Sequence, residues 1–453
     1  MYNRAQANLQ VFIRCRISMP KQMGNMQVFV KTYGCSANTA DSETLAGGLK
    51  AAGYKLADSE TNADLIIFNS CAVKGPTENR IIDDLKHVSK AKKVIVAGCL
   101  PLISLERLLR EVRFDGVVGP AAGEKIVGVV ERVLAGENVF ELQGALAAMP
   151  KLDLPRVQTN PVASVIPINF GCLGSCTFCC VKHARGHLRS YGIREIVERV
   201  EADVEAGTKE FWVTSQDTAC YGRDIGTNLA QLLNAVTEVE GDFRVRVGMM
   251  TPNLVTPFLS DLIAAFGSVK VFRFVHLPVQ SGDNEVLRLM RRFYTASEFK
   301  ETVAAFRNSF PEITVSTDVI VGFPGENVEA FENTLKLIRE VEPDIVNVSK
   351  FFARPKTAAW EMRSEAVDKV EIKRRSVKVA ELVKQVSLLR SQRWVGWEGE
   401  ILIDEKGKVG GTWVGRNFAY KPVAVRSEAD LLGKTVHVKV TKAFATHLVG
   451  TFE

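Results

Sequence analysis

The chain has 453 residues, of which 46% are hydrophobic and 24% are charged, a composition typical of a folded globular protein rather than a disordered one. At roughly 100 to 200 residues per domain, this length predicts about three domains. The formal net charge of +6 permits a nucleic-acid partner without demanding one. No run of about 18 apolar residues occurs, so we expect no membrane span.

The nine cysteines are an odd number in a long chain whose first 25 residues lack the apolar segment of a signal peptide. We therefore expect metal or redox chemistry rather than a disulfide framework, and a reducing, cytoplasmic location. Residues 1–25 are predicted to form a disordered extension, and the first convincing strand begins near Met26.

The first module, residues 26–140, repeats a short apolar run that ends in a cysteine. The runs MQVFVKTYGC, ADLIIFNSC and KKVIVAGC end at Cys35, Cys71 and Cys99. Such runs are typical of parallel strands buried on both faces, and helical patterns separate them. One of these patterns is expected to begin near Asp41 and to stop at Gly53.

In an open parallel sheet the ligand crevice lies beyond the carboxyl ends of the strands. We therefore predict that Cys35, Cys71 and Cys99 meet at one metal or cluster site. The alternative is that each is a small buried side chain that only fills space in the core.

The remaining chain divides at changes of pattern. Residues 141–160 contain Pro150 and Pro155 and little periodicity, which predicts a linker. Over residues 161–390 six apolar runs alternate with helical patterns, which indicates a complete or partial (β/α) barrel. This barrel region ends in a charged helix, expected from about Val367 to Arg393. Short strands punctuated by glycine over residues 391–453 predict a small β-barrel, so the expected fold class is α/β with an open parallel sheet, a partial barrel and a small β-barrel.

The stretch FGCLGSCTFCCVKHARG, residues 170–186, places Cys172, Cys176 and Cys179 in the spacing C-x3-C-x2-C. A structural zinc ion needs four ligands, and Cys180 is a poor fourth because zinc pairs are usually separated by about two to four residues. A [4Fe–4S] cluster normally takes four thiolates. Three thiolates from one loop therefore leave one iron open to a ligand that is not protein.

This triplet resembles that of the radical S-adenosylmethionine superfamily, in which the open iron chelates S-adenosylmethionine and the cluster splits it to give a 5′-deoxyadenosyl radical. Further motifs resemble the methylthiotransferases: KTYGCSANTADSE (31–43), NSCAVKGPTENR (69–80), GCLP (98–101), CTFCCVKHARGHLRSY (176–191), HLPVQSG (276–282), GFPGE (322–326) and a C-terminal domain of the TRAM type. VKHARG and TSQDTACYGRDIGTNL (214–229) resemble the archaeal and eukaryotic branch, which acts on threonylcarbamoyladenosine in tRNA.

The resemblance implies replacement of the C2–H of adenosine 37, beside the anticodon, by C2–SCH3. That carbon has no acidic proton and no leaving group, so general-base or nucleophilic catalysis would not break the bond. The resemblance further implies two [4Fe–4S] clusters, one on each cysteine trio, with S-adenosylmethionine as both methyl donor and radical source. The implied partners are the anticodon loop of tRNA, an electron donor such as a ferredoxin or flavodoxin, and a sulfur source. No catalytic side chain is assigned.

Further candidates follow the strand ends and the cluster loop. Cofactor contacts are expected from residues at strand ends, where capping or turn formation would use the same residue types: Thr214, Ser215, Gln216, Asp217, Gln280, Gly322 and Gly325. Substrate contacts are expected from two residues after the cluster loop and two in the C-terminal domain, Arg185, Gly186, Arg416 and Lys421.

The C-terminal domain also carries aromatic residues that are available for RNA binding, Trp413, Phe418 and Tyr420. The residues expected not to bind metal are Cys15, Cys180, Cys220 and His276, the last as a hydrogen-bonded barrel residue. Two other functions stay open: the same chemistry on isopentenyladenosine or on a ribosomal-protein aspartate, and an iron–sulfur RNA-binding sensor without turnover.

Overall fold

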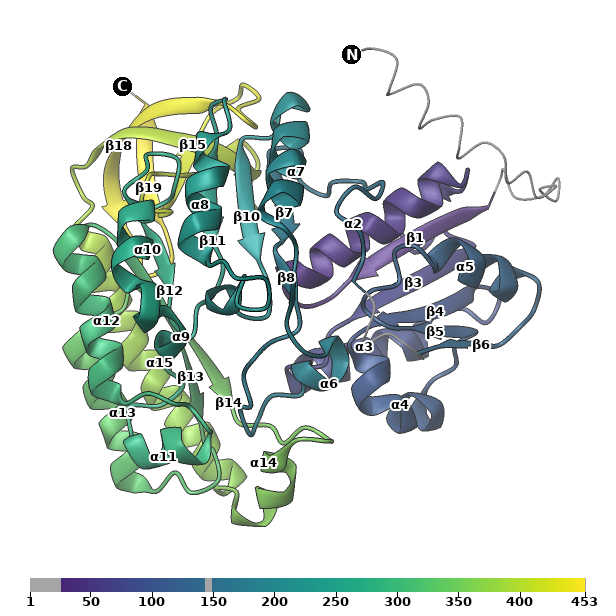
Figure 1. Ribbon diagram of the computed structural model, residues 1–453, viewed down its shortest axis with the longest axis horizontal. Coiled ribbons are helices and arrows are strands. Elements are labelled where there is room, and N and C mark those ends of the chain that lie inside the picture. Colours follow the sequence, from purple (N-terminus) through teal and green to yellow (C-terminus); the bar gives the residue numbers. More distant parts are fainter. Residues whose placement is uncertain (1–25, 143–148, 453) are drawn as a thin grey trace.

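The computed structural model describes residues 26–142 and 149–452. Figure 1 shows an N-terminal sheet domain on the right, a central open barrel, and a small C-terminal β-barrel at the upper left. The predicted extension over residues 1–25 and Cys15 lie outside the described residues. No helix in the described part is both long enough and apolar enough to cross a lipid bilayer.

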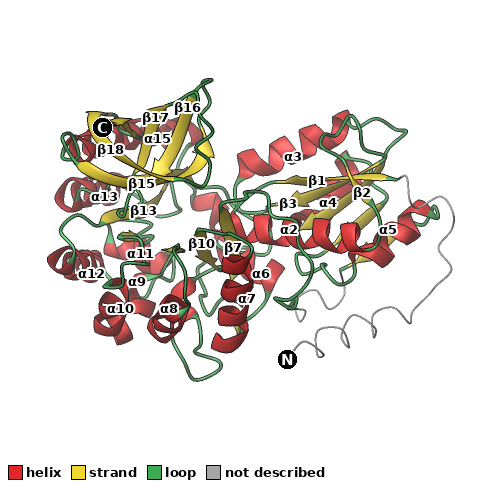
Figure 2. Ribbon diagram, turned by 90° about the horizontal axis from the view of Figure 1, so that it is seen from above, coloured by secondary structure: helices red, strands yellow, loops and turns green. Residues whose placement is uncertain are grey.

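The N-terminal domain is a parallel sheet between two layers of helices (Figure 2). Its strand order is β2-β1-β3-β4-β5-β6. The strands are β1 (Gln27–Thr32), β2 (Lys55–Leu56), β3 (Leu65–Ser70), β4 (Lys93–Gly98), β5 (Gly116–Val118) and β6 (Val139–Glu141). All six residues of β3 are buried, as expected for a parallel strand covered on both faces.

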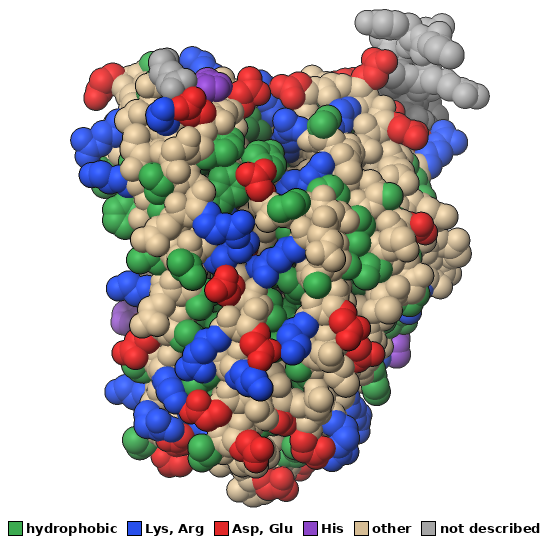
Figure 3. Space-filling model, turned by 90° about the vertical axis from the view of Figure 1, so that its left-hand side faces the viewer, with side chains coloured by type: hydrophobic (Ala, Val, Ile, Leu, Met, Phe, Trp, Pro, Cys, Tyr) green, Lys and Arg blue, Asp and Glu red, His purple; other side chains and the backbone are tan. Residues whose placement is uncertain are grey.

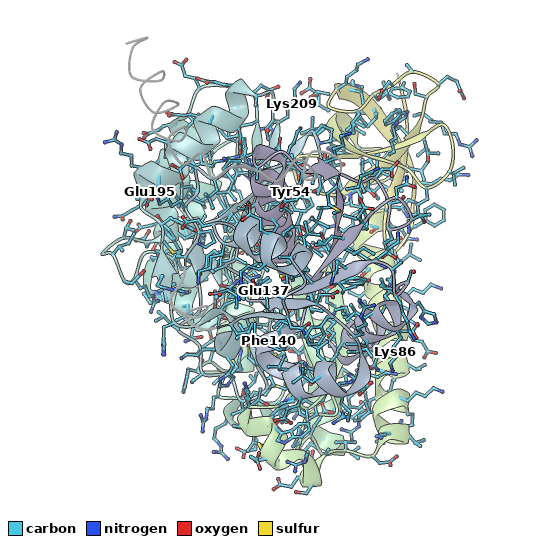
Figure 4. The ribbon with its side chains drawn as sticks, turned by 90° about the vertical axis from the view of Figure 1, so that its right-hand side faces the viewer. Tyr54, Lys86, Glu137, Phe140, Glu195 and Lys209 are labelled. Carbon is cyan, nitrogen blue, oxygen red and sulfur yellow. The ribbon has the colours of Figure 1, made fainter. Side chains whose placement is uncertain are left out.

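Four helices cover this sheet: α2 (Ser36–Ala51), α3 (Gly75–His87), α4 (Leu100–Glu111) and α5 (Ile126–Leu134). Apolar side chains of α3 and α4 pack on one face and those of α2 and α5 on the other. Figure 4 looks onto this domain, where Tyr54, Lys86, Glu137 and Phe140 are labelled.

The start predicted for the first of these helices is wrong. Helix α2 begins at Ser36, directly after Cys35, rather than near Asp41. Asp41 lies inside the helix and is buried, because it pairs with Arg185 of the central domain. The predicted stop is confirmed: Ala52 caps the helix, and Gly53 follows with a φ of +92°, which glycine adopts without strain.

The six predicted strands of the central domain are confirmed. They form two parallel sheets, β11-β10-β7 and β12-β13-β14, and Val245 bridges to Val271 where the two sheets meet. Their bounds are β7 (Ala163–Pro167), β10 (Glu210–Thr214), β11 (Arg244–Val247), β12 (Phe274–His276), β13 (Thr314–Val321) and β14 (Ile345–Lys350). Strands β7 and β14 are edge strands, so the barrel is partial.

Helices pack around the outside of this barrel (Figure 1). The longer ones are α7 (Ile193–Glu205), α8 (Leu229–Glu238), α10 (Leu259–Phe266), α12 (Ala296–Ser309), α13 (Val328–Val341) and α15 (Lys369–Gln392). Shorter elements are β8 (Asn169–Phe170), α6 (Val181–Arg185), β9 (Arg189–Ser190), η3 (Thr218–Cys220), α9 (Pro252–Val255), η4 (Thr256–Phe258), α11 (Asn284–Leu289), α14 (Ala358–Glu361) and η5 (Met362–Glu365).

The C-terminal strands close into a barrel of order β15-β16-β17-β19-β18. Their bounds are β15 (Glu398–Lys406), β16 (Thr412–Arg416), β17 (Pro422–Arg426), β18 (Thr435–Ala443) and β19 (Leu448–Phe452). Tyr420 packs edge-on against Phe272 and at a tilt against Phe274 of β12, with ring centroids 4.9 and 5.2 Å away. The small barrel therefore covers the amino-terminal end of the central strands. On the face shown in Figure 3, Lys and Arg side chains are interspersed with Asp and Glu.

Candidate active site

The first cysteine trio lies at one edge of the N-terminal sheet. Cys71 and Cys99 directly follow β3 and β4, and Cys35 follows β1, and these three strands are neighbours. Gly34 has a φ of +111°, and a Cβ there would lie 2.6 Å from Cys71 Cβ and 3.1 Å from its Sγ. Only glycine allows this close approach. Cys35 is exposed, which a cysteine that merely fills the core would not be.

The second trio lies in the loop between β8 and α6. The backbone N–H of Gly174 donates to Cys172 Sγ over 3.2 Å, and a Cβ on Gly174 would lie 3.3 Å from Cys172 Sγ and 3.7 Å from Cys176 Sγ. The backbone N–H of Cys179 bonds to the carbonyl of Cys176 at 3.1 Å. Gly174 therefore lies next to the thiols of Cys172 and Cys176.

Both trios consist of cysteine thiols, the donor type that holds iron–sulfur clusters. Among residues 26–142 and 149–452, no group of three or more His, Cys, Asp or Glu side chains is arranged so that it could hold a metal ion. Burial raises the pKa of Cys99 to about 12 and also raises that of Cys71. These thiols are neutral until a metal displaces their protons.

Arg292, which precedes α12, is a site residue that the sequence analysis missed. Its Nη1 donates to Cys176 Sγ over 3.3 Å, and its other nitrogens are held by Tyr294 Oη at 2.9 Å and the Pro278 carbonyl at 3.0 Å. It is buried. Arg292 and Cys176 are 116 positions apart, so no local pattern in the sequence could indicate the contact.

Direct contacts join the two trios. Arg185 of α6 is 2% exposed and pairs with Asp41 of α2 at 2.5 Å. The hydroxyls of Thr214 and Ser36 are hydrogen-bonded at 2.6 Å, and Ser36 is next to Cys35. The Cys180 thiol donates to the carbonyl of Ala72, beside Cys71, over 3.3 Å. Both trios therefore belong to one connected site, in which the buried Arg185 joins two elements rather than facing an open mouth.

Of the residues that follow β10, two accept hydrogen bonds from the backbone and one has a buried oxygen without a partner. The Asp217 carboxylate accepts from the backbone N–H of Ala219 at 3.1 Å and of Thr251 at 3.2 Å, which is the capping role. Ser215 Oγ accepts from the backbone N–H of Asp217 at 3.1 Å. Gln216 Oε1 is buried without a hydrogen-bond partner among the described residues. An orphaned buried oxygen is costly, so Gln216 is the member of this group that is ready to receive a ligand.

The other strand-end residues are placed mainly by backbone geometry. Gln280 has a φ of +73°, a strained conformation for a residue other than glycine. A side chain on Gly322 would collide with Ile372 of α15, and one on Gly325 would lie 2.6 Å from Leu289 of α11. The two glycines therefore permit close helix packing, and a cofactor contact is not needed to explain them. Gly186 caps α6 with a φ of +76°.

The expected RNA contacts of the C-terminal domain are engaged within the chain. Lys421 is buried, with its Nζ 2.7 Å from Asp344, and Arg416 Nε lies 3.0 Å from Asp404. Trp413 and Tyr420 are buried, and Phe418 packs on Trp394 and Trp397. In this structure these residues stabilise the small barrel and its contact with the central domain, and Arg416 and Phe418 remain half-buried.

An exposed aromatic pair lies elsewhere on the same barrel. Phe444 is 47% exposed and stacks on His447 with ring centroids 4.9 Å apart, in the turn between β18 and β19. The only sequence signal for this pair was an aromatic residue beside a turn. Of the residues expected not to bind metal, Cys220 donates to the Asp217 carbonyl at 2.9 Å and also contacts Cys172 of the second trio, and His276 lies 3.2 Å from Asp318.

Comparisons with known proteins agree with this layout. The chain matches the radical SAM superfamily over residues 166–338, Uncharacterized protein family UPF0004 over 27–119 and the TRAM domain over 392–452. A radical S-adenosylmethionine methyltransferase, TsrM from Kitasatospora setae, shares the fold, with a TM-score of 0.53 and 12% identity over 91% of this chain and 83% of that one. The superfamily match supports binding of S-adenosylmethionine and an iron–sulfur cluster.

Curated relatives match nearly the whole chain. A probable threonylcarbamoyladenosine tRNA methylthiotransferase from Pyrococcus abyssi is 42% identical over 85% of this chain and 90% of its own length. The human threonylcarbamoyladenosine tRNA methylthiotransferase is 35% identical over 92% of this chain and 72% of its own length. With these identities and this coverage, the chain belongs to the threonylcarbamoyladenosine tRNA methylthiotransferase family within the radical SAM superfamily.

Proposed function

We propose that this chain converts N6-threonylcarbamoyladenosine at position 37 of tRNA to its 2-methylthio form, replacing C2–H by C2–SCH3 and using S-adenosylmethionine as methyl donor and radical source. Family membership supports the reaction class. The observation that carries the proposal is the joining of two cysteine trios by Arg185–Asp41 and Thr214–Ser36. One site thereby contains both of the thiol sets that a combined sulfur and radical chemistry requires.

The proposal assigns one [4Fe–4S] cluster to Cys35, Cys71 and Cys99 and another to Cys172, Cys176 and Cys179. When bound, such clusters supply the one-electron chemistry and the sulfur that amino-acid side chains lack. The first cluster belongs to residues 26–140 and the second to residues 161–390, with 141–160 as the linker between them.

The chain's own residues orient and tune these thiolates. Arg292 places a buried positive charge on Cys176 Sγ, and Gly174 donates its N–H to Cys172 Sγ. Hydrogen bonds to cluster sulfurs are among the factors that set a cluster's reduction potential. Arg292 is fixed by Tyr294 and Pro278, so it holds its direction as electrons arrive.

RNA binding is assigned to residues 391–453. The exposed Phe444 and His447 stack offers a flat surface of the kind on which unpaired bases stack. An electron donor such as a ferredoxin or flavodoxin, a sulfur source, and a cytoplasmic location shared with the tRNA complete the proposal.

Deletion of the gene tests the assignment. Nucleosides from total tRNA of the deletion strain should lack 2-methylthio-N6-threonylcarbamoyladenosine and accumulate the precursor, as measured by mass spectrometry. Return of the product with the wild-type gene is the control. Persistence of the product in the deletion strain would contradict the proposal, as would loss of a methylthio group from isopentenyladenosine or from a ribosomal-protein aspartate instead.

A further inference from the structure

A cavity of about 460 Å³ opens next to the loop that carries the second cysteine trio, and its volume is within the roughly 300–1,000 Å³ usual for small-molecule sites. Residues of α6, of β9 and of the loop after β14 line it: Lys182, His183, Gly186, His187, Arg189 and Lys356. It therefore lies where the partial barrel is open, between the start of the barrel and the loop that follows its last strand.

The ionisable side chains that line this cavity are all basic. Its six residues include two lysines, one arginine and two histidines, but no Asp or Glu. Lys182 donates to the carbonyl of Gly174 over 3.4 Å and Lys356 to that of Leu102 over 2.9 Å. Neither lysine is paired with a carboxylate among the described residues, so both keep their positive charge for a partner. Such a cavity favours an anion.

The cavity is connected to both trios. At one end Lys182 contacts Gly174, whose Cβ position faces the thiols of Cys172 and Cys176. At the other end Arg189 donates to the carbonyl of Arg185 over 3.1 Å, and the guanidinium of Arg185 pairs with Asp41 on the helix that follows Cys35. A group held here therefore lies next to the loop that carries the second trio.

The backbone conformation of Lys356 is a second indication that the cavity is a functional site. It is exposed and has a φ of +66°, a left-handed conformation that costs about 1–3 kcal/mol for such a residue. Glycine would adopt this conformation without strain. The residue at this strained backbone position is a lysine, and its side chain lines the cavity.

Resting on the proposed function, we infer that this cavity binds the carboxylate of the threonylcarbamoyl group and thereby selects the modified nucleoside. That carboxylate is the negative charge that distinguishes the substrate from unmodified adenosine in the same RNA. Its chain is attached at N6, and N6 is separated from the reacting C2 only by C6 and N1 of the ring. An anchor on the carboxylate therefore orients C2 as well as choosing the substrate.

Binding measurements with three matched RNAs test the inference. Anaerobically purified full-length protein is titrated with an anticodon stem–loop that carries adenosine, threonylcarbamoyladenosine or its neutral methyl ester at position 37. Wild-type protein should bind the free-acid RNA about tenfold more tightly than the other two, as expected for one charge-assisted contact. Equal binding of all three RNAs by wild-type protein would overturn the inference.

Two charge-removing variants locate the contact. Lys182→Gln and Lys356→Gly should each remove most of this preference and leave binding of the adenosine and ester RNAs within about twofold. Lys86→Gln is the matched control, because Lys86 is an exposed lysine of the N-terminal domain outside the cavity (Figure 4). Iron content and circular dichroism of each variant should equal those of wild type.

The other outcomes are also decisive. Equal weakening of all three RNAs, with a smaller salt dependence, would assign the lysines to backbone phosphates and overturn the inference. Unchanged preference in both variants would overturn it too. Failure of the proposed function is a separate result: wild-type protein would give no methylthiolated nucleoside with any of these RNAs, whatever its binding preference.

Discussion

Each cysteine trio is held by at least one contact between residues that are distant in sequence. Gly34 brings Cys71 close to Cys35, and Arg292 reaches Cys176 from the far side of the barrel. Single substitutions can therefore separate the role of one trio from that of the other, because each trio has its own supporting residues.

Removal of one ligand from each trio should have different effects. Cys35→Ala is expected to keep reductive cleavage of S-adenosylmethionine but to abolish methylthiolation, because it damages only the sulfur-supplying site. Cys176→Ala is expected to abolish both. The released 5′-deoxyadenosine and the modified nucleoside are quantified in the same anaerobic reaction. Cys15→Ala is the control, since this cysteine belongs to neither trio. Equal losses in the two ligand variants would contradict separate roles.

Gly34→Ala should selectively damage the first trio. The new methyl group would lie 2.6 Å from Cys71 Cβ at a φ of +111°, so Cys71 must move. Iron per chain is expected to fall from about eight to about four, which is one cube of four irons. Gly53→Ala is the control, because Gly53 also has a positive φ but no atom lies within 4 Å of its added methyl group. Equal iron contents in Gly34→Ala and wild type would show that Cys71 tolerates the displacement.

At the scale of elements, short helices and loops lock the two domains together around the site. Helix α6 contributes Arg185 to Asp41 of α2, and the loop after β14 contributes Arg354 to Glu78 of α3. Both ion pairs are buried. A buried charge that loses its partner is strongly destabilising, so these pairs fix the distance between the trios.

Arg185→Met should destabilise the protein by about 3–5 kcal/mol, because it leaves the Asp41 carboxylate buried without its partner. The free energy of unfolding is measured in urea. Arg194→Met is the control: Arg194 pairs with Glu198 on the surface of α7, and loss of such a pair costs about 0–1 kcal/mol. Similar effects of the two substitutions would mean that Arg185 does not join the domains as described.

The strands of the central domain and the three main strands of the N-terminal sheet could be predicted because each is a continuous apolar run. The short strands β2, β5 and β6 could not, since two or three residues carry no periodicity. Strand β16 was missed because TWVGR is short and mixed in polarity. The start of α2 was misplaced because Asp41 resembles a residue of the first helical turn, whereas a partner 144 positions away buries it.

At the scale of the whole molecule, the C-terminal barrel seals the amino-terminal end of the central strands. Tyr420 packs on Phe272 and Phe274, and Lys421 pairs with Asp344. The sequence predicted a small barrel rich in basic and aromatic residues. It could not predict which of those residues face the neighbouring domain, because that depends on how the two domains pack. Of the predicted site residues, Cys35, Cys71 and Cys99 follow three neighbouring strands, and Cys172, Cys176 and Cys179 share one loop. Lys421 pairs with Asp344 and Arg416 with Asp404.

The contact between the C-terminal barrel and the central domain also makes the free energy of unfolding depend on pH. Glu210, at the start of β10, is buried beside Asp404 of the small barrel, and burial together with that neighbouring charge raises the pKa of Glu210 to about 7. The folded state therefore binds a proton that the unfolded state releases near pH 4.5. This contribution to stability is present below about pH 4.5 and is lost as the pH rises to about 7, an effect of about 3 kcal/mol.

Glu210→Gln should flatten this part of the pH profile. The free energy of unfolding, followed by tryptophan fluorescence in urea, should fall less between pH 5 and pH 7.5 in the variant than in wild type. Glu137→Gln is the control, since Glu137 is an exposed side chain paired with Arg132. Parallel pH profiles for Glu210→Gln and wild type would show that a group other than Glu210 causes the pH dependence.

The most direct test of the proposed function is the reaction itself. Anaerobically purified protein with reconstituted clusters is incubated with S-adenosylmethionine, a reductant, a sulfur source and tRNA that contains N6-threonylcarbamoyladenosine. Mass spectrometry of the digested tRNA should then detect its 2-methylthio derivative at position 37, together with 5′-deoxyadenosine. Release of 5′-deoxyadenosine without any methylthiolated nucleoside, or no turnover at all from protein with full iron content, would contradict the account.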